Sequence, residues 1–349
     1  MSTKRAKHRK ALALISGGLD SQLATKLVSD QGIEVIGANY RTGFTTEEHD
    51  ELFDLIEEDL EIEVRRPEVD EKEYLELIKS PEHGYGSYMN PCLDCRTLVL
   101  SEAKRYMEEI SADFVVTGEV LGQRPMTQRK DTMDLIKKES GLGKRLLRPL
   151  SAKLLSPTLP EERGWVDRDK LLDIECRSRK VQLELAEKLG INHYSQPAGG
   201  CLLTEEEFGH RLQELFDLKG RAKVTVDDVK LLRHGRHFRL REGAKAIIGR
   251  NEGENKQLSD FSSDFWSLRV ADFPGPLTLV TEEATEEELA TAARLTARYS
   301  QGRDKGQLEA IAERDGETKL FRVEPLDSES DSIAELRIES SNKSKSASR

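Results

Sequence analysis

The stretch that decides the fold is ALALISGGLDSQLA, residues 11–24, where an apolar run ends in two glycines. The run predicts a buried strand over 11–15, and the residues after the glycines predict a helix over 22–30. Glycine permits a tight turn and a close approach of another group to the backbone. Because amide groups and the positive dipole end at a helix start attract anions, we expect this turn to bind phosphate.

The residues of the turn narrow the kind of phosphate site. Neither GxxxxGK[ST], the P-loop of kinases and GTPases, nor the dinucleotide pattern GxGxxG occurs here. A turn that lacks a lysine can still grip pyrophosphate through backbone amides and the hydroxyls of Ser16 and Ser21. Asp20 would then hold Mg²⁺, which prefers carboxylate oxygens. The competing interpretation is an ordinary glycine turn with a capping residue.

The following residues alternate short apolar runs with helical periodicity, which predicts an α/β fold with a doubly wound parallel sheet. After about residue 205 the pattern changes to that of a second, smaller α+β domain. Further strands are expected over 34–39, 62–65, 113–116, 237–240 and 246–248, and helices over 47–60, 101–110, 170–189, 205–216 and 286–299. The predicted parts are a first domain over 1–205, a linker helix over 206–222, a second domain over 223–324 and a disordered tail over 325–349, rich in serine and charge.

Composition excludes several classes of protein. The 349 residues carry a net charge of −11, which argues against a dedicated nucleic-acid coat or a membrane-surface protein. The N-terminus, MSTKRAKHRK, is basic but is not followed by the apolar core of a signal peptide. No apolar stretch approaches the roughly 20 residues of a membrane span. With four cysteines and no disulfide framework, a cytoplasmic protein that makes no membrane contact is expected.

Three cysteines are candidates for chemistry. Cys92 and Cys95 form a CxxC pair in NPCLDCRT, and Cys201 follows two glycines in PAGGCLLT. A CxxC pair can be a redox couple, half of a zinc site or part of an iron–sulfur site. Three thiolates that leave one iron position open fit a [4Fe–4S] cluster, and a persulfide on Cys92 or Cys95 resolved by Cys201 fits equally. Cys176, inside the expected helix over 170–189, is interpreted as an incidental core cysteine.

The hexapeptide SGGLDS resembles the PP-loop of the N-type ATP pyrophosphatases at every fixed position. The resemblance implies that ATP activates an oxygen of the substrate as an AMP ester and that a nucleophile then displaces AMP. It also implies an ATP site at the turn, completed by a second phosphate-facing turn after the strand over 113–116. A weaker positional argument puts an adenine contact at the end of the second strand. The ATP-binding residues expected are Ser16, Gly17, Gly18, Asp20, Ser21, Asn39, Thr117 and Gly118.

SGGLDS together with NPCLDCR and GGCLLT resembles the tRNA thiouridine synthases, of both the 2-thiouridine and the 4-thiouridine type. The resemblance implies an ATP-dependent tRNA sulfurtransferase that adenylates a base carbonyl oxygen, uridine being favoured, and replaces it with sulfur. Asp20, Cys92, Cys95 and Cys201 would be its catalytic residues, the three cysteines also holding the metal cluster. The cofactors would be ATP, Mg²⁺ and a [4Fe–4S] cluster. The sulfur donor would be a cysteine desulfurase or free sulfide, and enzymes of this type often form homodimers.

The chain departs from these enzymes in three ways. Only about ten residues precede the first strand, so the usual N-terminal RNA-binding domain of the 4-thiouridine enzymes is not expected. The long C-terminal barrel of the 2-thiouridine enzymes is missing too, and position 92 is cysteine where those enzymes often have aspartate. These departures favour the cluster over the persulfide.

A basic segment in the second half offers a replacement RNA site. Residues 219–256 contain 11 Lys and Arg against 5 Asp and Glu. GRHFRL followed by IIGRNEGEN resembles the RNA-binding domain of the NFACT proteins. This implies a module that presents tRNA, although a solvated basic face is the simpler alternative. The expected RNA contacts are Arg233, Arg236, His237, Arg239, Arg250 and Asn251.

Three other functions compete with thiolation. A PP-loop amide ligase acting on a small metabolite would need an ammonia source and would use neither the three cysteines nor the basic segment. An RNA-binding factor with a nucleotide-sensing PP-loop would leave the cysteines dispensable. An enzyme that removes sulfur from a base would have no use for the ATP loop.

Overall fold

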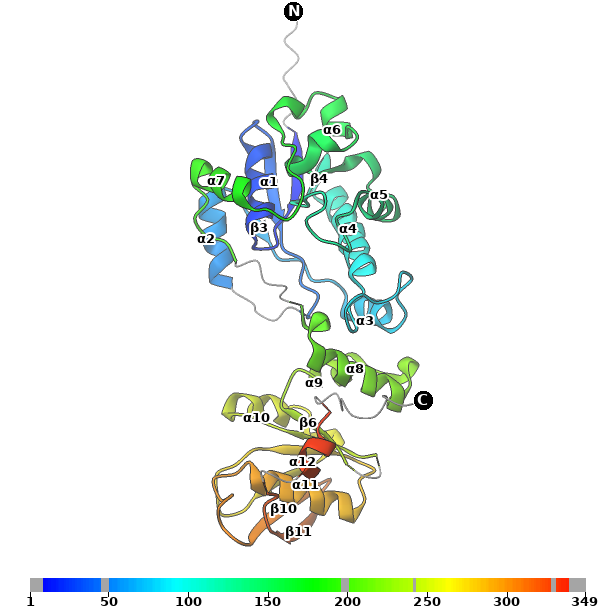
Figure 1. The fold of residues 1–349 in the computed structure, drawn as a ribbon, viewed down its shortest axis with the longest axis vertical. Coiled ribbons are helices and arrows are strands. Elements are labelled where there is room, and N and C mark those ends of the chain that lie inside the picture. The colour runs from blue at the N-terminus through cyan, green and yellow to red at the C-terminus, as the bar shows by residue number, and fades with distance from the viewer. Residues whose placement is uncertain (1–8, 45–49, 196–200, 241–242, 328–330, 339–349) are drawn as a thin grey trace, which may run out of the picture. The chain divides into compact units, whose positions relative to one another are not determined.

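The computed structural model describes residues 9–44, 50–195, 201–240, 243–327 and 331–338. The chain divides into two compact units, one ending at Thr204 and one beginning at Glu205 (Figure 1). Within the described ranges, no helix combines the length and the apolar character that a bilayer crossing requires.

The first unit is built on a five-stranded parallel sheet in the order β3-β2-β1-β4-β5. The strands are β1 (Lys10–Leu14), β2 (Glu34–Ala38), β3 (Val64–Arg65), β4 (Phe114–Val116) and β5 (Leu146–Leu147). Alternate residues of a strand point to opposite faces of its sheet. Ala11, Ala13 and Ile15 accordingly join the core on one face, and Leu12 and Leu14 join the core on the other. The predicted doubly wound α/β sheet is confirmed.

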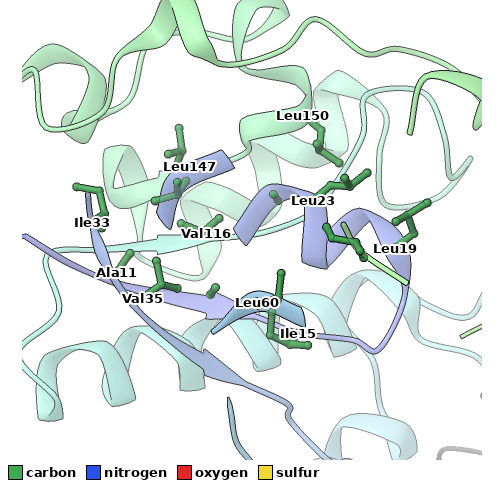
Figure 2. Close-up of a cluster of buried hydrophobic side chains, with 14 of the residues drawn as sticks. Ala11, Ile15, Leu19, Leu23, Ile33, Val35, Leu60, Val116, Leu147 and Leu150 are labelled. Carbon is green, nitrogen blue, oxygen red and sulfur yellow. The ribbon is translucent and has the colours of Figure 1, made fainter. Parts of the chain in front are cut away.

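Helices cover both faces of this sheet (Figures 1 and 2). On one face the core includes Leu19 and Leu23 of α1 and Ile56 of α2, and on the other it includes Leu100 and Met107 of α4. The helices are α1 (Leu19–Ser29), α2 (Asp50–Leu60), α3 (Glu71–Lys79), α4 (Cys92–Glu109), α5 (Lys130–Glu139), α6 (Leu159–Glu162) and α7 (Lys180–Leu189).

Two sequence predictions in this unit need correction. The helix expected over 101–110 begins at Cys92, so the CxxC pair forms the first turn of α4. The helix expected over 170–189 is wrong in its first half, because α7 begins only at Lys180. Before it, Cys176 adopts a left-handed φ of 73°, and its amide donates to the carbonyl oxygen of Leu121 at 2.8 Å. Cys176 is exposed, which contradicts its interpretation as a core residue.

The second unit is an antiparallel sheet of six strands in the order β11-β10-β8-β9-β7-β6. Leu289, Ala292 and Leu295 of α11 are buried in the core of this unit. The strands are β6 (Arg236–Arg239), β7 (Lys245–Ile248), β8 (Phe265–Val270), β9 (Thr278–Thr281), β10 (Leu308–Arg314) and β11 (Glu317–Val323). The helices are α8 (Glu206–Lys219), α9 (Val226–Leu231), α10 (Glu252–Ser259), α11 (Glu286–Arg298) and α12 (Asp331–Leu336).

The expected linker and tail both belong to this unit. Helix α8 is not a free linker, since its Glu214 pairs with Arg239 of β6 and lies 3.3 Å from Lys245 Nζ of β7. The disordered tail expected over 325–349 is wrong where the structure describes it. Residues 331–336 form α12, and the amide of Ile338 donates to the carbonyl oxygen of His237 at 3.1 Å. This contact pairs the C-terminal segment with β6, the edge strand of the sheet.

Candidate active site

The turn between β1 and α1 has the geometry of an anion site. Gly17 has φ +80°, a conformation that side-chain-bearing residues rarely adopt, and Gly18 caps α1 with an extended backbone. Ser21 Oγ accepts from the amide of Ser16 at 3.2 Å and donates to the carbonyl oxygen of Gly18 at 2.8 Å. The turn is therefore closed on itself, and the first amides of α1 have no partners within the helix. Ser16 is exposed at its tip.

A second loop, residues 117–128 after β4, packs against this turn. A Cβ on Gly118 would overlap backbone atoms of Asp20 and Ser21, so only glycine allows this approach. Thr117 is fully buried, and its hydroxyl donates to Glu119 Oε2 at 3.1 Å. Gly122 donates to the carbonyl oxygen of Gln128 at 2.7 Å and thereby closes the loop. Thr117 and Gly118, expected at a second phosphate-facing turn, thus lie beside the first turn.

Asp20 has one oxygen occupied and one unpartnered. Gln123 Nε2 of the second loop donates to Asp20 Oδ2 at 2.6 Å. Asp20 Oδ1 is buried and finds no hydrogen-bond partner in the described part of the chain. A buried carboxylate oxygen without a partner is unfavourable unless something compensates it. This oxygen therefore fits the Mg²⁺ that was expected at Asp20.

Residues near position 195, which no sequence motif marks, form hydrogen bonds with the turn and with α1. The amide of Ser195 donates to the carbonyl oxygen of Gly17 at 2.9 Å, and Ser195 forms an isolated parallel bridge with Gly18. Gln22 of α1 donates to the carbonyl oxygen of His193 at 2.8 Å. No motif marks these contacts, because they use backbone groups far away in the sequence. Asn39 Nδ2 donates to the carbonyl oxygen of Ile15 at 2.8 Å, so its amide braces the end of β1.

The cysteine pair lies at the start of α4 beside a buried tyrosine. Tyr74 of α3 donates its hydroxyl hydrogen to Cys95 Sγ at 3.2 Å. Burial raises the pKa of Cys95 to about 11, although the hydrogen bond from Tyr74 lowers it. The nearby thiols of Cys201 and Cys92 add to the rise. Burial also raises the pKa of Cys92. The three candidate cysteines therefore share one neighbourhood.

Tyr74 also connects the two cysteine segments. Its ring lies 5.3 Å, centroid to centroid, from that of Phe44. The carbonyl oxygen of Phe44 accepts from the amide of Leu202, the residue after Cys201, at 2.9 Å. Tyr74 is 1% exposed, so this arrangement is fixed within the core.

Three thiols are the donor set that an iron–sulfur cluster requires. Within the ranges that the structure describes, no three His, Cys, Asp or Glu side chains are arranged to hold a single metal ion. The donor chemistry thus fits the expected cluster, while the present positions of the thiols are not those of ligands around one ion.

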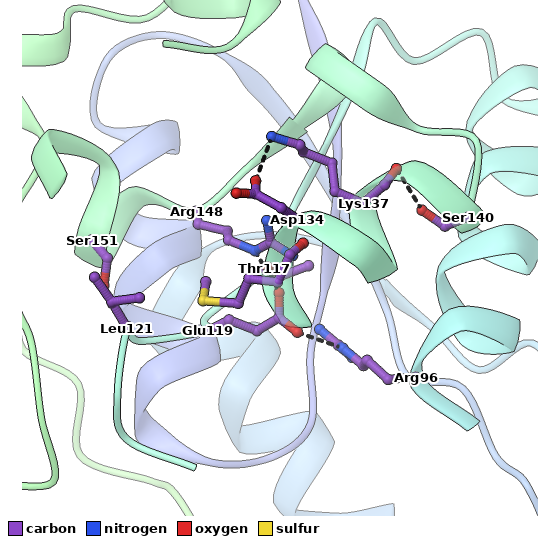
Figure 3. A network of polar contacts seen from close by, with 10 residues as sticks. Arg96, Thr117, Glu119, Leu121, Asp134, Lys137, Ser140, Arg148 and Ser151 are labelled. Atoms are coloured by element: carbon purple, nitrogen blue, oxygen red, sulfur yellow. Dashed lines mark hydrogen bonds and ion pairs between the residues drawn. The ribbon is translucent and has the colours of Figure 1, made fainter. Parts of the chain in front are cut away.

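A buried ion network ties the second loop to the cysteine helix (Figure 3). Glu119 is 4% exposed and lies 2.8 Å from Arg96 Nε and 2.7 Å from Arg148 Nε. Burial alone would raise the pKa of Glu119, but the two guanidinium charges outweigh it and lower the value to about 2. Arg96 follows Cys95 directly. Arg148 is buried and donates to Glu119.

The second loop thus reaches both halves of the site. Gly118 and Gln123 contact Asp20, and Glu119 holds Arg96 next to Cys95. Arg124 lies close enough to Cys92 that its charge favours the thiolate. A phosphate-binding turn and a group of thiols are thereby joined through a single loop of twelve residues, 117–128.

The basic segment of the second unit is more heavily paired than its composition suggests. Arg236 Nη1 donates to the carbonyl oxygen of Gly249 at 3.4 Å, and Arg250 Nη2 donates to that of Gly235 at 3.0 Å. Arg236 also stacks on the ring of Tyr299, 4.6 Å from its centroid. Asn251 caps α10 by accepting from the amide of Glu254 at 3.0 Å. Arg239 is engaged by Glu214 and by the carbonyl oxygen of Gly243.

His237 contradicts the prediction of an RNA contact. Its side chain is fully buried, and one ring nitrogen lies 2.8 Å from the carbonyl oxygen of His234. Burial, together with the charges of Lys245 and Arg211, lowers its pKa well below the usual value. A neutral, enclosed imidazole stabilises the sheet and offers no group to a phosphate. Arg233, Arg236 and Arg239 are half-buried and Arg250 and Asn251 are exposed, so these five side chains keep some access to solvent.

Two family models match parts of the chain. The model described as "Thiamine biosynthesis protein (ThiI)" matches residues 6–153, which contain both loops and the CxxC pair. The model described as "NFACT protein RNA binding domain" matches residues 235–333.

Individual relatives match over shorter stretches. The "Probable tRNA sulfurtransferase" of Thermococcus kodakarensis is 31% identical over 147 residues, 40% of this chain and 36% of that protein. The human "U4/U6.U5 tri-snRNP-associated protein 1" is 32% identical over 142 residues, 39% of this chain and 17% of that protein. The chain thus spans well under two thirds of the length of the curated relatives it matches.

Solved structures are similar at lower identity. "Crystal structure of a 4-thiouridine synthetase - RNA complex with bound ATP" matches with 19% identity and a TM-score of 0.35, covering 52% of each chain. "U34-tRNA thiolase NcsA from Methanococcus maripaludis with its [4Fe-4S] cluster" matches with 20% identity and a TM-score of 0.32, covering 65% of this chain and 73% of that one. The chain thus contains a region that matches the ThiI family over residues 6–153 and a region that matches the NFACT-type RNA-binding domain over residues 235–333.

Proposed function

We propose that this protein is an ATP-dependent tRNA sulfurtransferase, an enzyme that adenylates a base carbonyl oxygen, uridine being favoured, and replaces it with sulfur. The observation that carries the proposal is the second loop, because it contacts Asp20 of the phosphate turn through Gly118 and Gln123 and borders the cysteines through Glu119 and Arg124. A nucleotide site and a thiol site joined in this way suit a reaction that uses both in sequence.

In the first step the base oxygen attacks the α-phosphorus of ATP, and pyrophosphate leaves with the electron pair of the broken P–O bond. The amides at the start of α1 and the hydroxyls of Ser16 and Ser21 hold the phosphates, with Gly17, Gly18, Thr117 and Gly118 permitting the approach. Asp20 Oδ1 would hold Mg²⁺, which would supply positive charge beside the phosphates. Adenine lies near Asn39, whose Nδ2 is engaged by Ile15.

In the second step a sulfur nucleophile attacks the activated carbon and AMP leaves with the former base oxygen. Cys92, Cys95 and Cys201 would hold a [4Fe–4S] cluster, which would supply the site that carries the sulfur. Tyr74 orients Cys95 through its hydroxyl group. A persulfide on Cys92 or Cys95, resolved by Cys201, is the alternative use of the same thiols. Free sulfide would supply sulfur to the cluster at the oxidation level of the product. The persulfide would instead take its sulfur from the persulfide of a cysteine desulfurase, because free sulfide would need an oxidant to form it.

The second unit presents the RNA. The NFACT-type match over residues 235–333 supports tRNA as the partner, and the side chains proposed to contact it are Arg233, Arg236, Arg239, Arg250 and Asn251. These five side chains keep some access to solvent, which a contact with RNA requires. A homodimer would bring two such modules to one assembly.

The proposal is tested by two measurements on one protein. The chain is purified without oxygen, and its iron and sulfide contents are determined. Nucleosides of tRNA from a deletion strain are then analysed, with wild-type and Cys92→Ala, Cys95→Ala or Cys201→Ala chains supplied in turn. We expect a thionucleoside that is missing in the deletion strain and restored only by the wild type. An unchanged nucleoside profile in a strain that lacks the protein would overturn the proposal and favour an amide ligase or a nucleotide sensor.

Iron content separates the two sulfur mechanisms. Iron and sulfide that are lost when any of the three cysteines is replaced support the cluster. A thionucleoside made by an iron-free protein would leave the persulfide as the mechanism.

A further inference from the structure

Two glutamines, one buried and one half-buried, form a hydrogen-bonded chain that ends on Asp20. Gln182 of α7 donates from Nε2 to Gln123 Oε1 at 3.3 Å, and Gln123 donates from Nε2 to Asp20 Oδ2 at 2.6 Å. Gln182 is 0% exposed, and its Oε1 finds no partner in the part of the chain that the structure describes. The three residues come from α7, the second loop and α1.

The direction of this chain follows from chemistry. An ionised carboxylate can only accept hydrogen bonds, so the amide nitrogen of Gln123 must face Asp20. Its oxygen then faces Gln182 and must accept, which turns the amide nitrogen of Gln182 toward Gln123. Each amide is therefore held in one orientation by the charge on Asp20.

We propose that Gln182 and Gln123 are positioning residues that fix Asp20 so that it offers only Oδ1 to the Mg²⁺ of bound Mg–ATP. With Oδ2 occupied by Gln123, the carboxylate binds the cation through one oxygen and cannot rotate to chelate it through both. Oδ1 is the buried oxygen that has no hydrogen-bond partner among the described residues. The carboxylate of Asp20 therefore has one oxygen held by Gln123 and one oxygen available to a cation. Hydrogen-bond partners behind a metal ligand commonly set its orientation and its affinity.

Helix α7 is anchored so that it can serve this purpose. Beyond its C-terminal end, the carbonyl oxygen of His193 accepts from Gln22, and the amide of Ser195 donates to Gly17. Gln182 near the other end reaches Asp20 through Gln123. Both ends of the segment 182–195 are thus connected by hydrogen bonds to the phosphate turn and the start of α1. This inference rests on the proposed function only in taking the turn as an Mg–ATP site.

The test compares binding of Mg–ATP with binding of ATP in the presence of EDTA, by calorimetry on the full chain. Gln182→Met keeps the volume and removes the donor, and Gln123→Ala removes the direct contact from a half-exposed position. We expect each variant to bind Mg–ATP about tenfold more weakly than wild type, with metal-free ATP affected by less than about twofold. If Gln182→Met does not fold, Gln123→Ala alone decides.

Gln31→Met is the matched control. Gln31 also makes two hydrogen bonds, donating to the carbonyl oxygen of Leu27 at 3.0 Å and accepting from the amide of Asp167 at 2.7 Å, but neither partner belongs to the turn. Its Mg–ATP affinity should equal that of wild type. Equal weakening of Mg–ATP and metal-free ATP in the Gln182→Met and Gln123→Ala variants, or no weakening at all, would overturn the positioning role while leaving the ATP site intact. A wild-type chain that binds no Mg–ATP would instead overturn the ATP site itself.

Discussion

The phosphate turn, residues 16–21, and the basic segment, residues 219–256, differ in how well their structures suit the ligands predicted for them. At the turn, the predicted residues and the second loop converge, and Asp20 keeps an unpartnered oxygen at the point where a ligand is expected. In the basic segment, the predicted Arg236, Arg239 and Arg250 are already bonded to carbonyl oxygens or to Glu214, and His237 is buried. The turn keeps a buried carboxylate oxygen that has no partner among the described residues, whereas these arginines of the basic segment are bonded to other groups of the protein.

The difference lies in what each sequence pattern encodes. SGGLDS constrains backbone geometry through the left-handed Gly17, and Gly118 of the second loop lets that loop pack against Asp20 and Ser21. An excess of arginine encodes only charge, and charged side chains can pair internally as readily as they can meet RNA. The predictions below probe this contrast.

The largest effect is expected for Glu119→Gln. The substitution leaves Arg96 and Arg148 without their buried counter-charge, and removing one partner of a buried ion pair costs about 3–5 kcal/mol of unfolding free energy. Glu108→Gln is the control, because Glu108 pairs with Arg145 at 3.1 Å on the surface, where such a pair contributes about 0–1 kcal/mol. Urea unfolding measures both. Equal losses would show that the network does not stabilise the first unit.

The pH dependence of the unfolding free energy should reflect the ionisation of Glu119. Since the folded-state pKa of Glu119, about 2, lies below its ordinary value of 4.5, the ionised form stabilises the fold above pH 4.5. That contribution, about 3 kcal/mol, is lost as the pH falls from 4.5 toward 2. Urea unfolding at pH 5 and pH 3 should show a smaller acid loss in Glu119→Gln than in wild type. An identical loss in both proteins would assign the acid sensitivity to other groups.

Gly118→Ala tests the close packing of the two loops. Its Cβ would overlap the backbone of Asp20 and Ser21, so we expect a loss of about 1–3 kcal/mol in stability and a displaced, weakly binding phosphate turn. Gly306→Ala places a methyl group in open space and should change neither property. Thermal unfolding and ATP calorimetry check both variants. Normal ATP affinity in a folded Gly118→Ala chain would mean that the second loop is not part of the site.

The smallest effect is expected in the basic segment. Arg250→Ala removes an exposed guanidinium that is also tied to Gly235, so tRNA binding should weaken by less than about tenfold, and its salt slope should fall by about 1. His237→Ala should instead lower the stability of the second unit and leave the salt slope unchanged, because its side chain is enclosed. Filter binding over a salt series measures the slopes. A reduced slope in His237→Ala would place that residue at the RNA after all.

Sequence reasoning was reliable where a pattern constrains the backbone. Residues within one short window were enough to predict the strand over 11–15, observed at Lys10–Leu14, the glycine turn and the helix after it. The alternation of strands and helices was enough to predict the doubly wound sheet. It was less reliable where tertiary contacts decide. The helix expected over 170–189 is replaced before Lys180 by an irregular segment pinned to Leu121, although its leucines have helical spacing.

Parts of the candidate site could not be read from the sequence at all. Tyr74, Gln123, Gln182 and Ser195 reach the cysteines or the phosphate turn from residues far away along the chain, and no local motif marks them. The burial of His237 and the pairing of β6 with Ile338 likewise depend on the complete second unit. A histidine between arginines in GRHFRL predicts exposure by composition. In the structure both faces of β6 are covered, because His237 and its neighbour Phe238 point to opposite faces and both are fully buried.

The central claim is that the phosphate turn and the cysteines serve one reaction, and a single-turnover assay tests it most directly. The anaerobically purified protein is mixed with tRNA, labelled ATP and labelled sulfide, and pyrophosphate, AMP and thionucleoside are counted. Wild type should form all three in equal amounts, and Asp20→Asn should form none. Cys201→Ala should release pyrophosphate and accumulate adenylated tRNA, but should form neither AMP nor thionucleoside. Thionucleoside formed without ATP, or by Cys201→Ala at the wild-type level, would contradict the account.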